Sequence, residues 1–345
     1  MKPDFQTNFE TETNASDGSP TLSVRDMDVY YQLGRGGFLR KPTRVRAVAD
    51  LNLDIAPGET LGLVGESGSG KTTVGRAILR RIPGTTGEIR LCGKDISGLE
   101  GEALRAMRTR MQLVLQDPYT SLNPRMTIQD IVAEPLIVHG LAGSVAEARD
   151  EVRALLQLVG MPEDAYRRYP HSFSGGQRQR VGIARALALR PDLVVADEPV
   201  SALDVSVRAQ VVNLMQDLQR QRGLSYLFIA HDLSIVRHIS HRVAIMYSGR
   251  IVEIAACDDI YQNAHHPYTQ ALLSAVPVAN PHVQRNRKRH VLPGETADIF
   301  SLPKGCAFQN RCSRVESRCR QDTPELRLVE SGGAGHQVAC WNGGK

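Results

Sequence analysis

Short apolar runs alternate with longer amphipathic segments along most of the chain, and this alternation predicts its secondary structure. Residues 22–31 and 47–55 alternate apolar and polar positions, as strands with one solvated face do. The shorter, almost wholly apolar runs are expected to be buried strands, namely Thr60–Val64, Leu193–Ala196, Tyr226–Ala230 and Val243–Tyr247. Helices are predicted for residues 71–81, 175–189 and 205–221 and, from its periodicity, for segment 127–160. Buried strands that alternate with helices predict an α/β fold with a parallel sheet wrapped by helices.

The same pattern divides the chain into three parts. Residues 1–20 are polar and predict a disordered tail. Residues 21–262 carry the α/β pattern, with a mostly helical portion at about 117–185, and residues 263–345 predict a small, separate C-terminal module. No window of about 18 residues is apolar throughout, and the first residues lack the apolar core of a signal peptide. We therefore expect a cytoplasmic protein that does not itself cross a membrane.

The composition is typical of a soluble globular protein and gives no sign of nucleic-acid binding. The chain of 345 residues is 41% hydrophobic and carries a formal net charge of +5, which is ordinary for a soluble globular protein. Aromatic residues make up only 5% and do not interleave with basic ones, so nucleic-acid binding by base stacking is not indicated. The basic insert 35–46 is either a solvated loop or a contact with a charged partner or lipid headgroups. The charge run at 285–290 is interpreted as a solvated segment.

A complete G-x-x-x-x-G-K-[ST] phosphate loop stands between a predicted strand and a predicted helix. Gly65, Gly68 and Gly70 let the backbone turn tightly, so that successive N–H groups and the helix N-terminus face one anion. Lys71 supplies a charge for the β- and γ-phosphates, and Thr72 supplies a hydroxyl for Mg²⁺. The loop therefore predicts binding of a nucleoside triphosphate. Further contacts are expected from Glu66, Ser67, Ser69 and Thr73.

Two carboxylates, Asp197 and Glu198, follow an apolar run and so lie at the carboxyl edge of the predicted sheet, where open α/β folds bind ligands. Adjacent residues of a strand point to opposite faces, which predicts a separate role for each carboxylate. Gln116 and His231 also come directly after apolar runs. Such a glutamine or histidine alone does not indicate a function. Each becomes a candidate site residue only because of its position in the order of the other motifs.

Residues 173–180 read Phe-Ser-Gly-Gly-Gln-Arg-Gln-Arg. Ser174 can cap a helix that begins at Gly175. Its hydroxyl, together with the N–H groups of Gly175 and Gly176 and the positive helix end, forms a second phosphate-binding surface. One phosphate does not need two such surfaces from the same chain.

With this segment between the phosphate loop and the acidic strand, the chain resembles the ATP-binding subunits of ABC transporters over about residues 22–262. The resemblance implies a P-loop NTPase core, which consists of a RecA-like parallel sheet, an antiparallel β-subdomain and a helical signature subdomain. It also implies that two subunits clamp ATP, with residues 174–177 of one chain facing the γ-phosphate bound at Lys71 of the other.

The resemblance assigns roles to single residues. Asp197 is expected to hold Mg²⁺ and Glu198 to polarise the attacking water. Gln116 is expected to sense the metal and the water, and His231 to contact the γ-phosphate. All the motifs are present in order, so the resemblance implies a site that hydrolyses ATP with Lys71, Gln116, Glu198 and His231 as its catalytic residues.

Two further positions match the family pattern outside the catalytic set. Asp204, in Ser-Ala-Leu-Asp, matches the loop that passes between two ATPase subunits. Tyr31 matches the aromatic residue that stacks on adenine, with the adjacent Tyr30 as its competitor.

Other segments resemble the dipeptide/oligopeptide importer branch of the family. They are Gln-Asp-Pro-Tyr-Thr-Ser-Leu-Asn-Pro at 116–124, Arg-Gly-Gly at 35–37, His-Pro-Tyr-Thr at 266–269 and the tail from residue 292. The branch implies an ATPase at the cytoplasmic face of the inner membrane. Its partners would be two permeases, a second ATPase subunit (identical or different) and an external solute-binding protein. A permease helix is expected to dock beside Gln116 and segment 117–170. The branch includes nickel and glutathione importers, so the solute stays open.

Four of the six cysteines lie in the last 40 residues, at Cys306, Cys312, Cys319 and Cys340. In a cytosolic chain such a cluster points to metal rather than to disulfides. The spacing is not the paired C-x-x-C of a zinc ribbon. Some members of the family carry a [4Fe–4S] cluster in this tail, so an iron–sulfur cluster, zinc and reduced thiols all remain as hypotheses.

Two competing interpretations are weaker. A soluble ABC ATPase that acts on ribosomes or DNA commonly carries two ATPase cores or long coiled-coil insertions, whereas this chain has one core and no sustained heptads. A non-catalytic regulatory module would require a loss at Lys71, Glu198 or His231, and each is present. We therefore expect a transport ATPase that uses ATP and Mg²⁺ and has no nucleic-acid partner.

Overall fold

The structure is a computed structural model that describes residues 19–33, 43–117, 119–276, 282, 285, 292–294, 302–330 and 332–343. Three expectations fall largely outside these ranges. They concern the polar tail, most of the basic insert and most of the charge run at 285–290.

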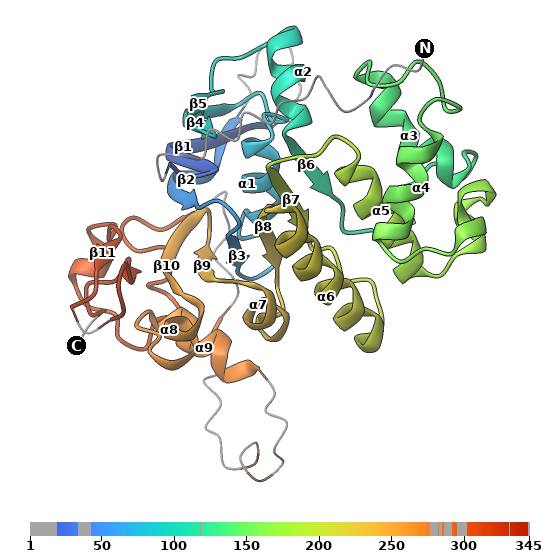
Figure 1. Ribbon diagram of the computed structural model, residues 1–345. Helices are drawn as coiled ribbons and strands as arrows, with labels where there is room; N and C mark the ends of the chain where they lie inside the picture. The colour runs from blue at the N-terminus through green and yellow to red at the C-terminus, as the bar shows by residue number, and fades with distance from the viewer. Residues whose placement is uncertain are drawn as a thin grey trace.

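The centre of the molecule is an eight-stranded sheet of order β11-β12-β10-β9-β3-β8-β7-β6 (Figure 1). The strands from β9 to β6 run parallel and comprise β9 Arg242–Tyr247, β3 Thr60–Val64, β8 Ser225–Ala230, β7 Leu193–Asp197 and β6 Met111–Val114. Every residue of β3, β7 and β8 is buried. The four apolar runs are thus confirmed as buried strands, whereas β6, which is only half-buried, was not predicted.

The two faces of this sheet pack against different layers. Leu193 and Val195 of β7 lie in one core, which also contains apolar residues of α1 (Lys71–Ile78) and of the antiparallel sheet. Val194 and Ala196 lie in the second core, which contains the apolar faces of most of the other helices. The alternation along β7 follows from the two-residue repeat of a strand.

A second, antiparallel sheet has the order β2-β1-β4-β5. Its strands are β2 Thr43–Ile55, β1 Leu22–Leu33, β4 Thr85–Leu91 and β5 Lys94–Asp95. Leu22 pairs with Ile55 on one side and with Leu91 on the other. The antiparallel β-subdomain is therefore confirmed, and the predicted strands at 22–31 and 47–55 extend slightly beyond the predicted bounds.

A helical lobe projects beside the sheet and contains α3 Ile128–Val138, α4 Arg149–Leu158 and α5 Gly175–Leu187 (Figure 1). Segment 127–160 is therefore two helices. Gly140 and Gly160, each with φ 71°, follow α3 and α4, because glycine accepts the left-handed backbone that ends a helix without strain. Short 3₁₀ turns at Glu163–Arg167 and Pro170–Ser172 complete the lobe.

The remaining helices lie around the sheet. They are α2 Gly101–Thr109, α6 Val205–Arg222, α7 Leu233–Ile239, α8 Cys257–Gln262 and α9 Pro267–Ala275, with a 3₁₀ turn at Arg318–Arg320. Within the described ranges, no helix combines the length and apolar character that crossing a bilayer requires.

The described part of the C-terminal extension continues the main sheet. Strand β12 (Gln337–Val338) pairs antiparallel with β10 (Arg250–Ala256), and β11 (Arg327–Leu328) pairs with β12. The predicted separation of the module from the core therefore does not hold for these residues.

Buried Glu253 of β10 joins the extension to the core. Its carboxylate accepts hydrogen bonds from His336 Nε2 at 2.9 Å and from the backbone N–H groups of His265 at 2.6 Å and His266 at 3.1 Å. Burial alone would raise the pKa of Glu253, but these hydrogen bonds outweigh burial and lower it. Because a buried carboxylate needs such donors, the extension is anchored at this point.

The start of α9 is predicted to be sensitive to acid. His266 Nδ1 accepts the Tyr268 N–H at 3.1 Å, and burial lowers the pKa of His266 from 6.5 to about 4, against an opposing effect of Glu253. Between about pH 6.5 and pH 4, this histidine is therefore protonated in the unfolded chain but stays neutral in the folded chain. The difference lowers the free energy of unfolding by about 2 kcal/mol at pH 5. We expect the melting temperature to fall from pH 7 to pH 5, and to fall less in His266→Asn, which keeps a cap acceptor.

Melting curves at both pH values test this prediction. His238→Asn, at an exposed position of α7, is the control and should keep the wild-type fall. Equal falls in wild type and His266→Asn would contradict the role of His266.

Candidate ATP site

The phosphate loop connects β3 to α1, and its glycines occupy positions where a side chain would clash or would strain the backbone. A Cβ at Gly65 would lie 2.1 Å from the backbone oxygen of Met246. Gly68 and Gly70 have φ values of 79° and 103°, and Gly70 is the N-cap of α1. These residues form the tight turn that presents the loop and the start of α1 to one anion.

Lys71 is the first residue of α1, and its side chain lies within the loop. Its Nζ donates to Gly65 O and Glu66 O, both at 2.8 Å, and to Ser69 Oγ at 3.5 Å. Burial lowers the pKa of Lys71, and the nearby carboxylates of Glu198 and Asp197 oppose that effect. A phosphate at this position would further stabilise the charged ammonium.

Asp197 ends β7 and contacts the loop through Thr72, whose Oγ1 donates to Asp197 Oδ1 at 3.0 Å. Burial raises the pKa of Asp197, although the Thr72 hydrogen bond and the positive Arg76 oppose it. A divalent cation would stabilise the ionised carboxylate, and a hydroxyl beside a carboxylate is a suitable oxygen pair for Mg²⁺. These residues therefore fit the predicted metal.

Glu198 lies just after β7 rather than on it, and its φ of 48° is unusual for a residue with a side chain. Its carboxylate accepts from Gln116 Nε2 at 3.0 Å and lies 3.2 Å from His231 Nδ1, so three predicted residues meet at one group. Glu198 thus has contacts different from those of Asp197, which bonds to Thr72. The left-handed backbone brings Glu198 to the same sheet edge as Asp197, where both act on the charge of Lys71.

Ser174 caps α5 as expected. Its hydroxyl accepts from Gln177 N at 3.4 Å, and Gln177 Oε1 accepts from Ser174 N at 3.1 Å, so both residues form a capping box. A Cβ at Gly176 would lie 2.2 Å from Val207 Cγ1, and one at Gly175 would lie 3.2 Å from a methyl of Leu203. The glycines therefore allow the start of α5 to pack closely against the start of α6.

The helical lobe carries α5, whereas α1 lies in the central layer (Figure 1). Residues 174–177, at the start of α5, therefore belong to a different layer of the molecule than the phosphate loop. Asp204, the N-cap residue of α6, precedes Val205, which is 80% exposed. This exposed apolar residue lies where the resemblance places contact with a second subunit.

Tyr31 lies near the loop, with its Oη 3.3 Å from Thr73 Oγ1. Its competitor Tyr30 is covered by the guanidinium of Arg44 at 3.9 Å from the ring centre and donates to Asp28. The half-exposed ring of Tyr31 is thus the more accessible of the two. Ser67 is exposed on the same loop.

Sequence reasoning missed contacts that connect the residues on either side of Gln116 to α5. The guanidinium of Arg178 lies 4.3 Å from the ring centre of Tyr119, and Gln179 Nε2 donates to Leu115 O at 3.4 Å. Arg185 Nη1 also donates to a carbonyl of this loop, Ser121 O, at 2.7 Å. No local sequence signal indicates such long-range pairs.

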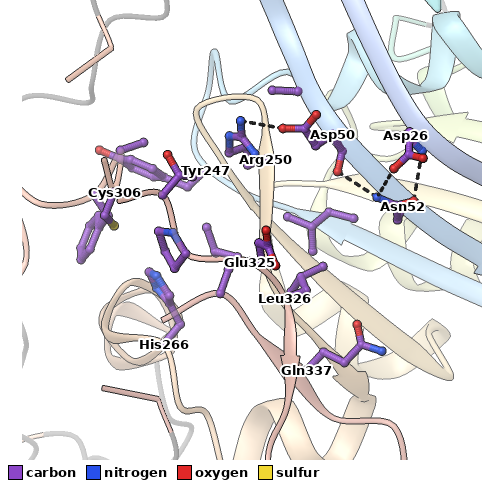
Figure 2. A pocket seen from close by; sticks show the side chains of 18 residues that line it. Asp26, Asp50, Asn52, Tyr247, Arg250, His266, Cys306, Glu325, Leu326 and Gln337 are labelled. Carbon is purple, nitrogen blue, oxygen red and sulfur yellow. Dashed lines mark hydrogen bonds and ion pairs between the residues drawn. The ribbon is translucent and has the colours of Figure 1, made fainter. Parts of the chain in front are cut away.

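A cavity of about 480 Å³ lies between the extension and the antiparallel sheet (Figure 2). Asp26, Asp50 and Asn52 line one side and are joined by hydrogen bonds, and Arg250 pairs with Asp50 at 2.8 Å. Among the predicted site residues, Cys306 alone contributes to the described lining. The cavity is therefore separate from the nucleotide residues.

The metal hypotheses for the four tail cysteines find no support among the residues that the structure describes. Burial and the three neighbouring thiols raise the pKa of Cys306 to about 11, so its side chain is a neutral thiol near pH 7 in the absence of metal. Among the described residues, no group of three or more histidine, cysteine or acidic side chains is arranged to hold a metal ion. The iron–sulfur and zinc hypotheses therefore gain no support from these residues. Cys257 is buried and Cys92 is half-buried, as expected of packed residues.

Comparison with known proteins agrees with this site. Residues 48–201 match the family model described as ABC transporter, and residues 252–319 match that described as the oligopeptide/dipeptide transporter C-terminal region. Among solved structures, the ATP-binding cassette MJ0796 in a dimeric post-hydrolysis state with ADP and Pi covers 68% of this chain and 98% of its own, with a TM-score of 0.60 and 28% identity.

Curated relatives match almost the whole chain. The oligopeptide transport ATP-binding protein OppF of Salmonella typhimurium is 47% identical over 321 residues, which are 92% of this chain and 95% of the relative. The corresponding protein AppF of Bacillus subtilis is 47% identical over 94% of this chain and 98% of its own length. The chain therefore belongs to the ATP-binding subunits of ABC transporters, in their oligopeptide/dipeptide branch.

Proposed function

We propose that this chain hydrolyses ATP to power the import of dipeptides or oligopeptides through an ABC transporter. The observation that carries the proposal is the meeting of Gln116, Glu198 and His231 at one carboxylate beside the phosphate loop. The solute class rests on the relatives, which are named for oligopeptide transport.

ATP is held first through its phosphates. Gly68 and Gly70 shape the loop, and Lys71 supplies the positive charge for the β- and γ-phosphates. Thr72 and Asp197 would hold Mg²⁺, which neutralises phosphate charge when it is bound. Tyr31 would cover the adenine.

Hydrolysis follows from the position of Glu198. Its carboxylate accepts a hydrogen bond from the attacking water and polarises it, while Gln116 orients the carboxylate and senses the water. His231 contacts the γ-phosphate as negative charge moves from it. The strained backbone at Glu198 holds its carboxylate at the sheet edge, where the reaction occurs.

A second subunit completes the site. Ser174, Gly176 and Gln177 of one subunit would face the γ-phosphate bound at Lys71 of the other, because the start of α5 offers N–H groups and a positive helix end. Asp204 and the exposed Val205 would lie at the same interface. ATP binding then joins the two subunits, and hydrolysis releases them.

The motion would reach the membrane through the loop after Gln116. Tyr119 in that loop is 57% exposed and stacks with Arg178 of α5, so a shift of the helical lobe moves the loop. We place the docking site of a permease helix at this loop and the adjacent segment 117–170. The chain would then act at the cytoplasmic face of the inner membrane, with two permeases, a second ATPase subunit and an external solute-binding protein.

A soluble ABC ATPase that acts on ribosomes or DNA is the alternative. It is not favoured, because oligopeptide transport proteins match this chain over more than nine-tenths of its length, including the extension.

Affinity purification of the tagged chain from native membranes tests the proposal. We expect two multi-span permeases, an ATPase subunit and a peptide-binding protein to co-purify. Recovery of ribosomal or DNA-repair proteins without permeases would overturn the transport function and leave the ATPase activity.

A further inference from the structure

Glu66 of the phosphate loop is held at each of its polar groups. Its N–H donates to Tyr268 Oη at 2.9 Å, and its carbonyl accepts from Lys71 Nζ at 2.8 Å and from Ser69 N at 3.2 Å. Its carboxylate accepts from Arg311 Nη1 at 2.8 Å and Nη2 at 3.2 Å. Few conformations of Glu66 satisfy all these bonds together, so the contacts fix the loop where it turns toward Lys71.

Two of these partners come from the C-terminal extension. Tyr268 lies on α9, and Arg311 lies in the loop after Phe308, so neither belongs to the ATPase motifs. Both side chains are largely buried. Tyr268 is fully buried, and its ring packs 4.8 Å from that of Tyr247 and 5.5 Å from that of Phe308, measured between ring centres. Tyr247 also lines the cavity of Figure 2.

In the ion pair between Arg311 and Glu66, the guanidinium neutralises a carboxylate that lies beside the phosphate-binding residues. The Glu66 carboxylate is close enough to Lys71 to act on its charge, so it also lies near the anion that Lys71 binds. The Arg311 side chain is only 10% exposed and that of Glu66 25%, which limits screening by water. With Arg311 removed, an uncompensated carboxylate would face the phosphates and repel them.

We propose that Arg311 and Tyr268 are positioning residues for ATP, through which the C-terminal extension orients the phosphate loop and neutralises Glu66. The proposal rests on the function proposed above, in which this loop binds the phosphates. The residues act through Glu66 and do not touch the reacting atoms.

Titration calorimetry of the full-length chain with MgADP tests the proposal, because ADP engages the phosphate loop without the γ-phosphate contacts of a second subunit. We expect Arg311→Met to weaken MgADP binding about tenfold. The control Arg314→Met removes the same charge from the same segment, but Arg314 donates to Gln270 rather than to the loop, so it should stay within about twofold of wild type.

The double variant Glu66→Gln/Arg311→Met separates this role from a general effect on folding. It should recover to within about threefold of wild type, because no unpaired carboxylate remains. A merely structural role for Arg311 predicts no recovery. Tyr268→Phe keeps the buried ring but removes the acceptor for the Glu66 N–H, and it should weaken binding about threefold whether or not Arg311→Met folds.

Steady-state kinetics give a second readout. In Arg311→Met the KM for ATP should rise about tenfold while kcat changes less than about twofold, because Glu198 and His231 are not touched. Binding by Arg311→Met and Tyr268→Phe as tight as that of Arg314→Met would overturn the proposal. Lys71→Met tests the proposed function separately. If that variant bound MgADP as tightly as wild type, the phosphate loop would not be the nucleotide site.

Discussion

Glu198→Gln is expected to lower ATP turnover about a thousandfold while MgATP still binds. Glutamine fills nearly the same space and can still contact Gln116, but its neutral amide cannot polarise or deprotonate the attacking water. The phosphate contacts of Lys71 and Thr72 remain, so affinity for MgATP should change little or rise. Steady-state phosphate release and equilibrium MgATP binding measure both parts of the prediction.

Glu163→Gln is the matched control for this variant, because Glu163 is an exposed carboxylate in the helical lobe. It should keep wild-type turnover. Wild-type turnover in Glu198→Gln would remove Glu198 from the catalytic set, and loss of binding as well would show that the substitution disrupted the loop.

Lys71→Met is expected to weaken MgADP binding about a hundredfold, because a buried phosphate would lose its charge-assisted contact. The same change should not destabilise the nucleotide-free protein. Lys71 is only 5% exposed and burial lowers its pKa, so the folded state disfavours the charged ammonium that methionine removes. Removal of this buried charge should offset the loss of the hydrogen bonds to Gly65 O and Glu66 O. Binding should therefore fall while the melting temperature without nucleotide stays level or rises.

Calorimetry and melting curves check both halves, with exposed Lys94→Met as the control for loss of one positive charge. A large fall in melting temperature in Lys71→Met would mean that the lysine mainly supports the fold.

The sequence predicts the buried strands well because their apolar runs are short and bounded by turns. It predicts β6 and β10 poorly, since β6 is only half-buried, and the charge of Glu253 interrupts the apolar run of β10. Segment 127–160 has continuous helical periodicity, so the break at Gly140 was not predicted, although a left-handed glycine is its physical cause.

The resemblance implies that the site residues act together, but the sequence pattern does not predict the contacts between them. The distances between Glu198, Gln116 and His231 depend on the order of parallel strands and on one left-handed residue, and no local pattern indicates either. Arg311 and Glu66 are 245 positions apart, so their pairing also depends on how the extension packs.

ATP-driven uptake of a labelled oligopeptide tests the central claim most directly. The complex that co-purifies with the chain would be placed in liposomes with its nucleotide sites outward and the peptide and binding protein inside, so that import appears as release of peptide. We predict release that requires MgATP with the wild-type chain and is abolished by Glu198→Gln. Release that is equally fast with Glu198→Gln, or that proceeds without ATP, would contradict the account.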